Sequence, residues 1–477
     1  MTSGRDRDRG PEPDDFHLPE GSIVPALASE VAQAGGRLLV VGGWVRDCLQ
    51  GEISRDLDLE VLGLSRERVS ELLVPFGFSK PVGRQFPVWR QTRQHIDLAY
   101  PRAAGDELVS SSPHALEAVF HEAGRHRDLT INAIGWDPIT NRLIDPWNGS
   151  GDLEARLLRA VSVETFGLDP LRVVRVARLK ARLDARVEPG LDVLCRDLEL
   201  VGVPSERISA ELRKILCECD KPSIAFDFLA DVGQLGIFAP VAALRGVAQD
   251  PTWHPEGDVY RHTCMVVDRA AQIARAEELT GLGREILLFS ALCHDLGKAA
   301  TTRIDEDGRI RSLGHERVGA ALTRSWLEAL CLGEERVRAV EVLVENHLAP
   351  SQFFAQDASG RAYRRLARKL ARGGLTVVEL ERVARADHLG RTTEDAISGR
   401  YPAGESFLKH ANAAKIREGV RADVVSAELL MKRGIAPGPQ LGRLLARCRE
   451  IQDETGSLEA APIVDRALAE INGSESD

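Results

Sequence analysis

The sequence predicts an α+β protein in which an α/β region near the N-terminus is followed by a region built almost wholly from helices. Short strand-like runs separated by short helical stretches dominate residues 38–145, whereas helical periodicity takes over from about Leu153. Strands followed by a run of helices are typical of an α+β architecture. With 477 residues, 43% of them hydrophobic, the chain is long enough to bury several domain cores.

The α/β region is expected to hold one mixed sheet, entered after a helix over residues 21–34. Apolar runs and alternating patterns predict strands over 38–41, 56–62, 86–91, 95–99, 131–136 and 142–145. Helical patterns predict two further helices, over 44–50 and 65–74.

The helical region is interrupted by clusters of proline and glycine near residues 187–190, 202–204, 250–257 and 400–404. Such clusters indicate boundaries between structural elements or domains. Together with the change of periodicity, they divide the chain into parts. We expect a disordered segment over 1–20, an α/β head over 21–160, a helical neck and body over 161–250, a further helical domain over 251–395 and a helical tail over 396–477.

Composition argues against several classes of protein. No apolar run approaches the length of a transmembrane helix, so we expect no membrane association. The first residues, MTSGRDRDRGPEPDD, lack the apolar core of a secretory signal. The 8 cysteines are scattered without the spacing of a zinc site and are interpreted as reduced thiols. These features predict a cytoplasmic protein.

The net charge of −10 argues at first against a nucleic-acid partner, but phosphate contacts depend on local patches of basic residues. Two such clusters follow helical patterns. The first contains Arg172, Arg175, Arg178, Lys180 and Arg182, and the second contains Arg361, Arg364, Arg365, Arg368, Lys369 and Arg372. The alternative interpretation of each cluster is an ordinary solvated helix face.

An alternating stretch, DLDLE, places two carboxylates on one face of a predicted strand. Asp56 and Asp58 point the same way and lie about 7 Å apart at their Cα atoms, which lets them share two divalent cations. Just upstream, a buried apolar run leads into Gly42 and Gly43, whose backbone N–H groups before a helix suit a triphosphate. The alternative for the strand alone is a half-solvated strand with no catalytic function.

The order GGWVRD and then RDLD resembles the nucleotidyltransferase superfamily, and specifically bacterial class II tRNA nucleotidyltransferases and poly(A) polymerases. The resemblance implies two Mg²⁺ ions held by Asp56 and Asp58. It implies nucleotide contacts at Gly42, Gly43 and Arg46. Asp97, on a further predicted strand, would complete the metal site or polarise the attacking hydroxyl, and its alternative is an exposed aspartate on an edge strand.

A second segment of the head, RHRDLTINA, resembles the RRDxTINA motif of the same family. In that motif the arginine and aspartate contact the sugar and phosphates of the nucleotide, and the asparagine braces the loop. Arg127, Asp128 and Asn132 match it, while His126 replaces the first arginine.

The segment FGLDPLRVVRVARL resembles the EDxxR motif, whose aspartate and arginine bind the base edge as a protein template for C and A. Asp169 and Arg172 occupy those positions, and a carboxylate with a guanidinium fork matches the Watson–Crick edge of cytosine. Arg175 and Arg178 follow on the same helix face and suit the triphosphate. Leu168 stands where the family has glutamate. The alternative is a basic amphipathic helix.

Histidines and aspartates recur between residues 253 and 391 within helical patterns. A single histidine is more often a packing or surface residue, but this many imidazole and carboxylate donors suit a five- or six-coordinate transition metal. The candidate ligands are His262, His294, Asp295, His315, His347 and Asp387. Their order, H…HD…H…H…D, resembles the HD phosphohydrolase superfamily. Lys298 is expected to steady a phosphate or its carboxylate partner. His254 is a lesser candidate for this site, and a structural cap is the favoured interpretation.

The tail sequence IAPGPQLG resembles the family's GxxPGPxLG end, so the resemblance runs from about residue 21 to 455. It implies a cytoplasmic enzyme that adds CCA to the 3′ end of tRNA from CTP and ATP. The HD domain would bind a transition metal such as Ni²⁺, Mn²⁺ or Co²⁺ and hydrolyse 2′,3′-cyclic phosphates or phosphomonoesters. The helical body would hold the tRNA acceptor stem by its shape and backbone charge.

Three alternatives remain open at this point. A poly(A) polymerase or an A-only adding enzyme would share the same head. An HD nucleotide phosphohydrolase with an inactive head is a different reaction class, and the intact Asp56 and Asp58 argue against it. A non-enzymatic RNA-binding protein is the third alternative, and the complete set of HD ligands argues against that.

Overall fold

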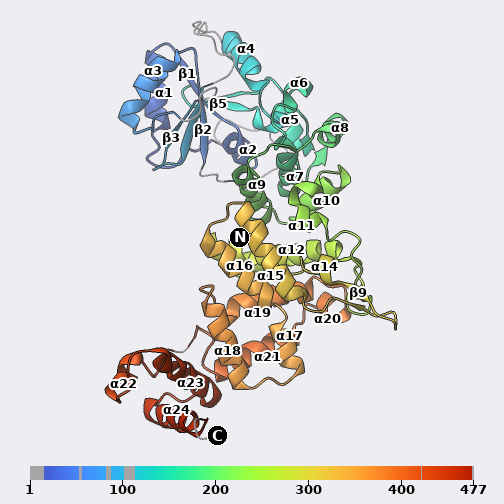
Figure 1. The fold of residues 1–477 in the computed structure, drawn as a ribbon. Coiled ribbons are helices and arrows are strands. Elements are labelled where there is room, and N and C mark those ends of the chain that lie inside the picture. Colours follow the sequence, from blue (N-terminus) through green and yellow to red (C-terminus); the bar gives the residue numbers. More distant parts are fainter. Residues whose placement is uncertain (1–15, 53–55, 82–86, 101–112, 421, 475–477) are drawn as a thin grey trace. The chain divides into compact units, whose positions relative to one another are not determined.

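The computed structural model describes residues 16–52, 56–81, 87–100, 113–420 and 422–474. The chain forms two compact units, Met1–Gly202 and Val203–Asp477 (Figure 1). Their boundary falls in one of the proline–glycine segments that predicted a division, over residues 202–204. Most of the expected disordered segment over 1–20 lies outside the described residues.

The first unit contains a mixed six-stranded sheet in the order β3-β4-β2-β1-β5-β6. Its strands are β1 Arg37–Val41, β2 Leu57–Leu62, β3 Val88–Gln91, β4 Ile96–Ala99, β5 Gly135–Asp137 and β6 Arg142–Ile144. Neighbouring strands pair antiparallel except β2 and β4, which run parallel. The mixed sheet and the α+β class predicted from the sequence are confirmed.

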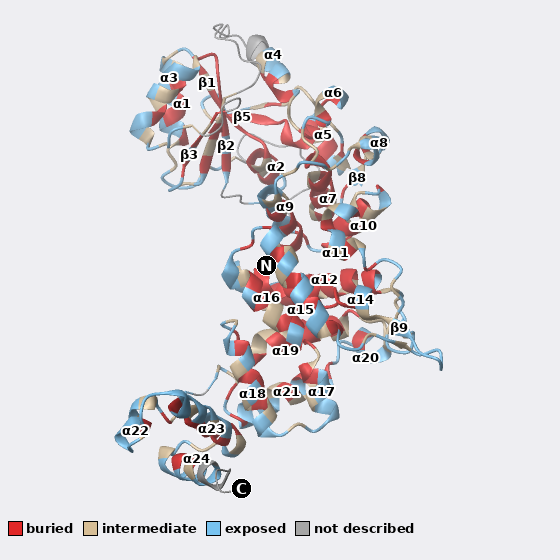
Figure 2. Ribbon diagram, viewed as in Figure 1, coloured by how far each residue is buried: buried red, intermediate tan, exposed pale blue. Residues whose placement is uncertain are grey.

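Hydrophobic residues pack on both faces of this sheet, and its central strands contain many buried residues (Figure 2). On one face, the alternating residues Leu57, Leu59 and Val61 of β2 join a core with the N-terminal helices. On the other, Phe120 packs with Leu39 and Val41 of β1. The helices of the sheet region are α1 Val24–Gln33, α2 Gly43–Leu49, α3 Arg66–Leu73, η2 Val74–Phe76 and α4 Pro113–Gly124.

One predicted strand was wrong at its start. Residues 131–136 were expected to be extended, but Thr130–Asn132 form a short 3-10 turn, η3, and β5 begins only at Gly135. The side chains of this turn explain the difference, because Thr130 Oγ1 donates to Asp152 and Asn132 Nδ2 donates to Asp128. These side-chain bonds hold the segment as a turn instead of a continued strand.

The rest of the first unit is mostly helical and follows the sheet directly. Its elements are α5 Gly149–Glu154, β7 Leu157–Leu158, α6 Val163–Phe166, α7 Arg172–Leu183, β8 Arg186–Val187 and α8 Pro189–Asp197. Although α7 is rich in arginine, it is largely buried, and Arg172 and Arg178 are among its buried residues. The alternative interpretation of this basic cluster, a solvated helix face, is therefore wrong for α7.

In its described residues, the second unit is helical except for one small hairpin. Its first elements are α9 Ser205–Glu218, α10 Ser223–Asp231, η4 Leu235–Phe238, α11 Ala239–Ala242, α12 Val259–Ala276, α13 Gly281–Cys293 and α14 Lys298–Thr301. The hairpin of β9 Arg303–Ile304 and β10 Ile310–Arg311 follows. The next helices are α15 His315–Ala329, α16 Glu334–Asn346, α17 Ala349–Ala355, α18 Gly360–Ala371, α19 Val377–Leu389, α20 Glu394–Ile397 and α21 Pro402–Ala413. Helix α13 packs against α12, α16 and α19, and α19 also packs against α12 and α16. Helix α15 packs against α16 (Figure 1).

The C-terminal helices α22 Ala427–Lys432, α23 Pro439–Thr455 and α24 Ala460–Ser474 have a core of their own, which includes Leu430, Leu444 and Val464. Helix α18 packs against α23. Arg364 Nε donates to the Asp453 carbonyl at 2.6 Å, and Arg368 Nε donates to the Asp453 carboxylate at 2.8 Å. Part of the second basic cluster therefore holds α18 against the tail.

No described helix combines the length and the apolar composition needed to cross a membrane.

Candidate active sites

The first site lies on β2 and β4 of the head sheet. Asp56 directly precedes β2 and Asp58 lies within it, and both are exposed while Leu57 and Leu59 are buried. Asp58 is paired in register with Asp97 across the parallel β2–β4 ladder. Residues that are opposite in a ladder carry side chains on the same face, so Asp97 accompanies Asp58.

The electrostatics of Asp58 indicate a place for cations. Partial desolvation of its carboxyl by neighbouring protein atoms raises the pKa of Asp58, although the residue as a whole is exposed. The positive charge of Arg127 opposes this rise in pKa, whereas Asp97 and Asp56 add to it. Three carboxylates that repel one another on an exposed strand face suit divalent cations, which prefer oxygen ligands.

A glycine allows the chain to pass close to Asp58. Gly42 has φ +74°, and a Cβ atom there would lie 3.2 Å from Asp58 Oδ2 and 3.5 Å from Arg127 Nη1. Any larger residue would therefore be strained and would crowd the carboxylate. Gly43 then begins α2.

Arg127 occupies the space between β2 and the η3 turn. Its Nη2 donates to Glu60 Oε1 at 2.6 Å and its Nη1 donates to the Asn132 carbonyl at 3.0 Å. Its Nε is buried and meets no acceptor among the described residues. The two bonds use two of the five N–H groups of Arg127.

Asp128 is the centre of a buried hydrogen-bond network. It accepts from Arg175 Nε at 2.6 Å, from Asn132 Nδ2 at 3.0 Å and from the Leu129 backbone at 2.8 Å. Burial would raise the pKa of Asp128, but these partners outweigh it and hold the pKa well below its ordinary value. Asp128 is therefore ionised and fixed in place.

The structure places Arg46 inside this network rather than at a surface. Arg46 is buried, and it donates to Asn132 Oδ1 at 2.7 Å and to Asp47 Oδ1 at 2.6 Å. Burial lowers the pKa of its guanidinium, and Asp47 opposes that change. The nucleotide contact predicted for Arg46 stays a prediction, and its observed contacts brace the η3 turn.

The expected template residues lie at the start of α7. Arg172 is buried and donates to the backbone carbonyls of Thr165 and His126. His126, which replaces the first arginine of the RRDxTINA motif, therefore contacts Arg172 through its backbone. Asp169 Oδ1 accepts from the Leu171 backbone at 3.3 Å. Leu168 is 62% exposed, so the side chain that departs from the motif points toward solvent.

The second site is a buried cluster of histidines and aspartates in the second unit. All predicted ligands are buried there, and each lies at or near the end of a helix. They come from α12 (His262), the end of α13 (His294, Asp295), the start of α15 (His315), the end of α16 (His347) and α19 (Asp387).

The ring nitrogens and carboxylate oxygens of this cluster converge. His262 Nε2 lies 3.1 Å from Asp387 Oδ1, and His294 Nε2 lies 3.1 Å from Asp295 Oδ2. His315 Nε2 lies 3.3 Å from Asp295 Oδ1 and 3.4 Å from His347 Nε2. The structure therefore brings together every residue that the sequence proposed for this site.

The opposite ring nitrogens of these histidines are each engaged with an acceptor. The Nδ1 atoms of His294, His315 and His347 lie 2.7 or 2.8 Å from the carbonyls of Ala291, Ser312 and Val344. His262 Nδ1 lies 2.7 Å from Glu256 Oε1. Since these partners only accept, Nδ1 carries the proton and the Nε2 lone pairs face the centre of the cluster, as in metal-bound histidines.

The buried polar atoms at this centre fit a divalent cation. His294 Nε2 and both carboxylate oxygens of Asp295 make no well-formed hydrogen bond among the described residues, and their close contacts are to one another, to His315 and to Lys298. Burial lowers the pKa of His347 to about 4, so its imidazole is neutral. The mixture of nitrogen and oxygen donors suits a transition metal of higher coordination rather than a tetrahedral structural zinc.

The structure agrees with the expectation for Lys298 but not with that for His254. Lys298 Nζ lies 2.8 Å from Asp295 Oδ2, in agreement with the expectation that it steadies a carboxylate. His254 was expected to be a structural cap, and this is wrong. Asp258 caps α12, and His254 Nδ1 instead lies 2.9 Å from Glu256 Oε1 beside the cluster.

Sequence reasoning missed Glu256 and Arg391. Glu256 accepts from His262, and Arg391 Nη2 lies 3.3 Å from Asp387 Oδ1. A signal was present for Glu256, because HPEGD places a carboxylate directly before the helix that carries His262. Arg391 follows Asp387 by one helical turn, a spacing at which charged side chains meet.

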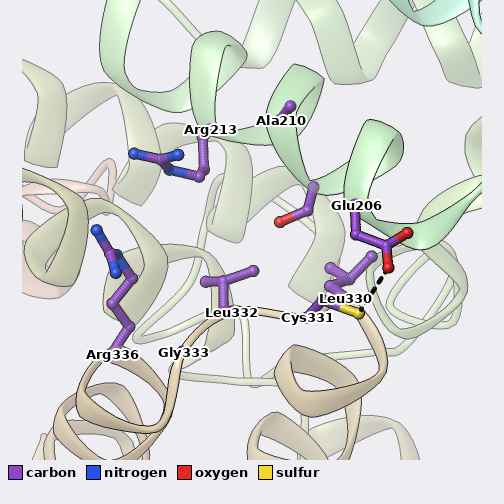
Figure 3. Close-up of a pocket in the computed structure, with 9 residues that line it drawn as sticks. Glu206, Ala210, Arg213, Leu330, Cys331, Leu332, Gly333 and Arg336 are labelled. Atoms are coloured by element: carbon purple, nitrogen blue, oxygen red, sulfur yellow. Dashed lines mark hydrogen bonds between the residues drawn. The ribbon is translucent and has the colours of Figure 1, made fainter. Parts of the chain in front are cut away.

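A cavity of about 190 Å³ in the second unit shares no lining residue with the metal cluster. Figure 3 shows Arg213 and Arg336 at one end of it, and Glu206 and Cys331 at the other. Glu285 accepts from both arginines, and the Cys331 thiol donates to Glu206. The polar groups of this cavity are therefore engaged with one another.

Two family models match regions of this chain that include the residues described above. Residues 38–159 match the poly(A) polymerase head domain, and residues 259–391 match the HD domain. The multifunctional CCA protein of Xanthomonas oryzae pv. oryzae is 33% identical over 426 residues, which covers 87% of this chain and 97% of the relative. That of Methylococcus capsulatus is 34% identical over 437 residues, covering 87% and 93%.

Solved structures share the fold at lower identity. The Bacillus stearothermophilus CCA-adding enzyme in complex with CTP has a TM-score of 0.62 at 18% identity, covering 95% of this chain and 98% of that one. The Thermotoga maritima CCA-adding enzyme complexed with tRNA has a TM-score of 0.56 at 18% identity, with 94% of each chain covered. From the identity and coverage of its relatives, the chain belongs to the family of multifunctional CCA proteins, with a poly(A) polymerase head domain and an HD domain.

Proposed function

We propose that this protein adds CCA to the 3′ end of tRNA from CTP and ATP, and that its HD domain hydrolyses phosphoesters. The observation that supports the first activity is the group of three carboxylates on β2 and β4, beside the Gly42 turn, in a chain of this family. Names of the relatives specify CCA rather than poly(A) or A-only addition.

In the head, Asp56 and Asp58 would hold two Mg²⁺ ions. Bound there, the ions would supply charge neutralisation for the attacking 3′-oxygen and for the departing pyrophosphate. Asp97 lies in register with Asp58, where its carboxylate would orient and accept a proton from the attacking hydroxyl. The backbone of Gly42 and Gly43 would approach the triphosphate, which a side chain at Gly42 would prevent.

Nucleotide recognition would use the buried network behind the carboxylates. Arg127 has a buried Nε donor for the sugar or phosphates, while Asp128 and Asn132 hold the η3 turn in shape. Asp169 and Arg172 would read the base edge of C and A at the start of α7. Arg175 and Arg178 lie on the same helix and would add positive charge for the triphosphate.

In the HD domain, a divalent transition metal such as Ni²⁺, Mn²⁺ or Co²⁺ would be held by the ligands His262, His294, Asp295, His315, His347 and Asp387. Bound there, the metal would lower the pKa of a coordinated water for attack on a phosphoester. The substrates would be 2′,3′-cyclic phosphates or phosphomonoesters. Lys298 would fix Asp295 through its ion pair.

The remaining predictions about organisation are part of this proposal. The head would extend to about residue 160, the neck and body to 250, the HD domain to 395 and the tail to the C-terminus. The helical body would bind the acceptor stem by shape and backbone contacts, and the protein would act in the cytoplasm.

The deciding experiment is incorporation of labelled CTP and ATP into tRNA that ends at the discriminator base. We expect two C and one A per tRNA, and A alone on tRNA ending in CC. A tRNA that already ends in CCA is the control and should gain nothing. Incorporation of A without C, or unlimited addition of A, would replace this proposal with an A-only or poly(A) activity.

A further inference from the structure

Glu256 lies against the metal cluster but outside the set of ligands that the HD pattern implies. We infer that Glu256 is a positioning residue that orients His262 toward the metal and joins it to the segment behind Asp387. This inference rests on the proposed metal-binding function of the cluster.

Three donors converge on the Glu256 carboxylate. Its Oε1 lies 2.7 Å from His262 Nδ1 and 2.9 Å from His254 Nδ1, and its Oε2 accepts from the Thr392 backbone at 3.1 Å. The side chain is 1% exposed, so water does not compete for these bonds. Both carboxylate oxygens are thus engaged, and the carboxylate is held in one orientation.

The position of His262 explains why it needs this external acceptor. The Nδ1 atoms of His294, His315 and His347 each bond to the carbonyl of the residue three positions earlier. His294 and His347 cap the ends of α13 and α16, where helix carbonyls lack intrahelical partners, and the carbonyl beside His315 precedes α15.

His262 has no such carbonyl. It lies inside the first turns of α12, where the carbonyl three positions earlier, that of Val259, takes part in the helix hydrogen bonds. A carboxylate from the preceding loop takes its place. Glu256 therefore does for His262 what the backbone does for the other ligand histidines.

The bond from the Thr392 backbone to Glu256 links the surroundings of His262 to those of Asp387, two ligands that are far apart in the sequence. Thr392 follows Arg391, and Arg391 Nη2 contacts the Asp387 carboxylate. His262 Nε2 itself lies 3.1 Å from Asp387 Oδ1. Glu256 thus fixes the loop before α12 to the end of α19, on the side of the cluster where His262 and Asp387 meet.

A different interpretation is that Glu256, His254 and His262 hold an ion of their own, since their ligand atoms all lie within 4.8 Å of one another. His262 would then use both ring nitrogens for cations and would have to lose its Nδ1 proton. Orientation by a hydrogen bond requires no such deprotonation, and it matches the role of the acceptors at the other histidines. The number of bound ions separates the two interpretations.

The test is titration of the metal-free full-length protein with Co²⁺, comparing wild type, Glu256→Gln and Glu256→Ala. Glutamine keeps the size of the side chain and one acceptor oxygen, so it should retain part of the function. We expect the same number of ions per chain in all three. Affinity should fall by about 10- to 100-fold in Glu256→Ala, with a smaller fall in Glu256→Gln. The visible Co²⁺ spectrum should change with it.

Glu285→Gln is the matched control. Glu285 is also a buried glutamate that accepts from two side chains, Arg213 and Arg336, but neither is a proposed ligand. This variant should lose thermal stability while it keeps wild-type Co²⁺ affinity and spectrum. Nucleotide addition by the head should be unchanged in every variant.

Three results would overturn the inference. Unchanged affinity and spectrum in both Glu256 variants would show that His262 needs no such support. Fewer bound ions in the Glu256 variants than in wild type would make Glu256 a ligand instead. Wild-type protein that binds no Co²⁺, Ni²⁺ or Mn²⁺ would overturn the proposed HD function itself, and this inference with it.

Discussion

Arg175 Nε donates to Asp128 Oδ2 at 2.6 Å and so connects α7, which carries the expected template, to the loop before η3. Asp128 also accepts from Asn132, which in turn accepts from Arg46 on α2. The three segments around the head site are therefore linked by buried or partly buried, charge-assisted hydrogen bonds. Such bonds are stronger than those between neutral groups.

Replacing Asp128 with asparagine should destabilise the protein by about 1–3 kcal/mol at pH 7, because it removes a charged acceptor from buried donors. The pKa of Asp128 is lowered in the folded state, so its charge stabilises the fold above the unfolded pKa near 4. That stabilisation is lost as the pH falls through the folded value. Urea unfolding at several pH values should show the difference between wild type and Asp128→Asn shrinking below about pH 4.

Changing Asp58 to asparagine should abolish nucleotide addition, because only Asp56 would remain of the pair proposed to hold the two cations. Folding should be unaffected or slightly improved, since crowding and the charges of Asp97 and Asp56 raise the pKa of Asp58. The measurements are CTP and ATP incorporation in Mg²⁺ and thermal unfolding. Asp184→Asn, at an exposed aspartate paired with Arg156, is the control that should retain activity. Near-normal incorporation by Asp58→Asn would refute the site.

Asp169→Ala should impair the choice of CTP and ATP over UTP and GTP more than it weakens triphosphate binding. Loss of one base-reading acceptor should cost about 1–3 kcal/mol of discrimination. Competition between the four nucleotides on one tRNA measures this directly. Leu168→Glu, which restores the glutamate of the motif at an exposed position, is the companion variant and should leave selectivity intact. Unchanged selectivity in Asp169→Ala would place the template elsewhere.

The double variant His294→Ala with Asp295→Ala should lose the bound transition metal and the hydrolysis of 2′,3′-cyclic nucleotides. Two donors at the centre of the ligand set disappear, and metal affinity depends on the complete set. Addition of CCA should survive, because its cations are expected at Asp56 and Asp58. Metal content and both activities should be measured on one preparation. A folded variant that no longer adds nucleotides would contradict the independence of the two sites.

The sequence predicted most of the head because its strands alternate or form apolar runs, and these patterns are local. Leu57, Leu59 and Val61 are buried as the alternation of β2 requires. The prediction failed where distant side chains decide the backbone. Thr130 bonds to Asp152, 22 residues away, and this contact belongs to a turn rather than a strand.

The same limit applies to the candidate sites. The HD ligands followed from their order along the chain, but the role of Glu256 depends partly on Thr392, 136 residues away. The basic cluster on α18 was indistinguishable from a solvated or RNA-binding face. Its Arg364 and Arg368 contact Asp453, which lies 89 and 85 residues further along the chain. No periodicity within a helix reports such a partner.

The spread of the HD ligands along the chain has a consequence for how this region folds. His262 and Asp387 are 125 residues apart, so an ion that binds both closes a long loop, much as a covalent cross-link would. Binding also favours the folded state by mass action, and this stabilisation rises with the logarithm of the free metal concentration once the site is mostly filled. Chelation should therefore speed proteolysis of the helices between these ligands, while the head, whose sheet requires no such closure, resists digestion as before.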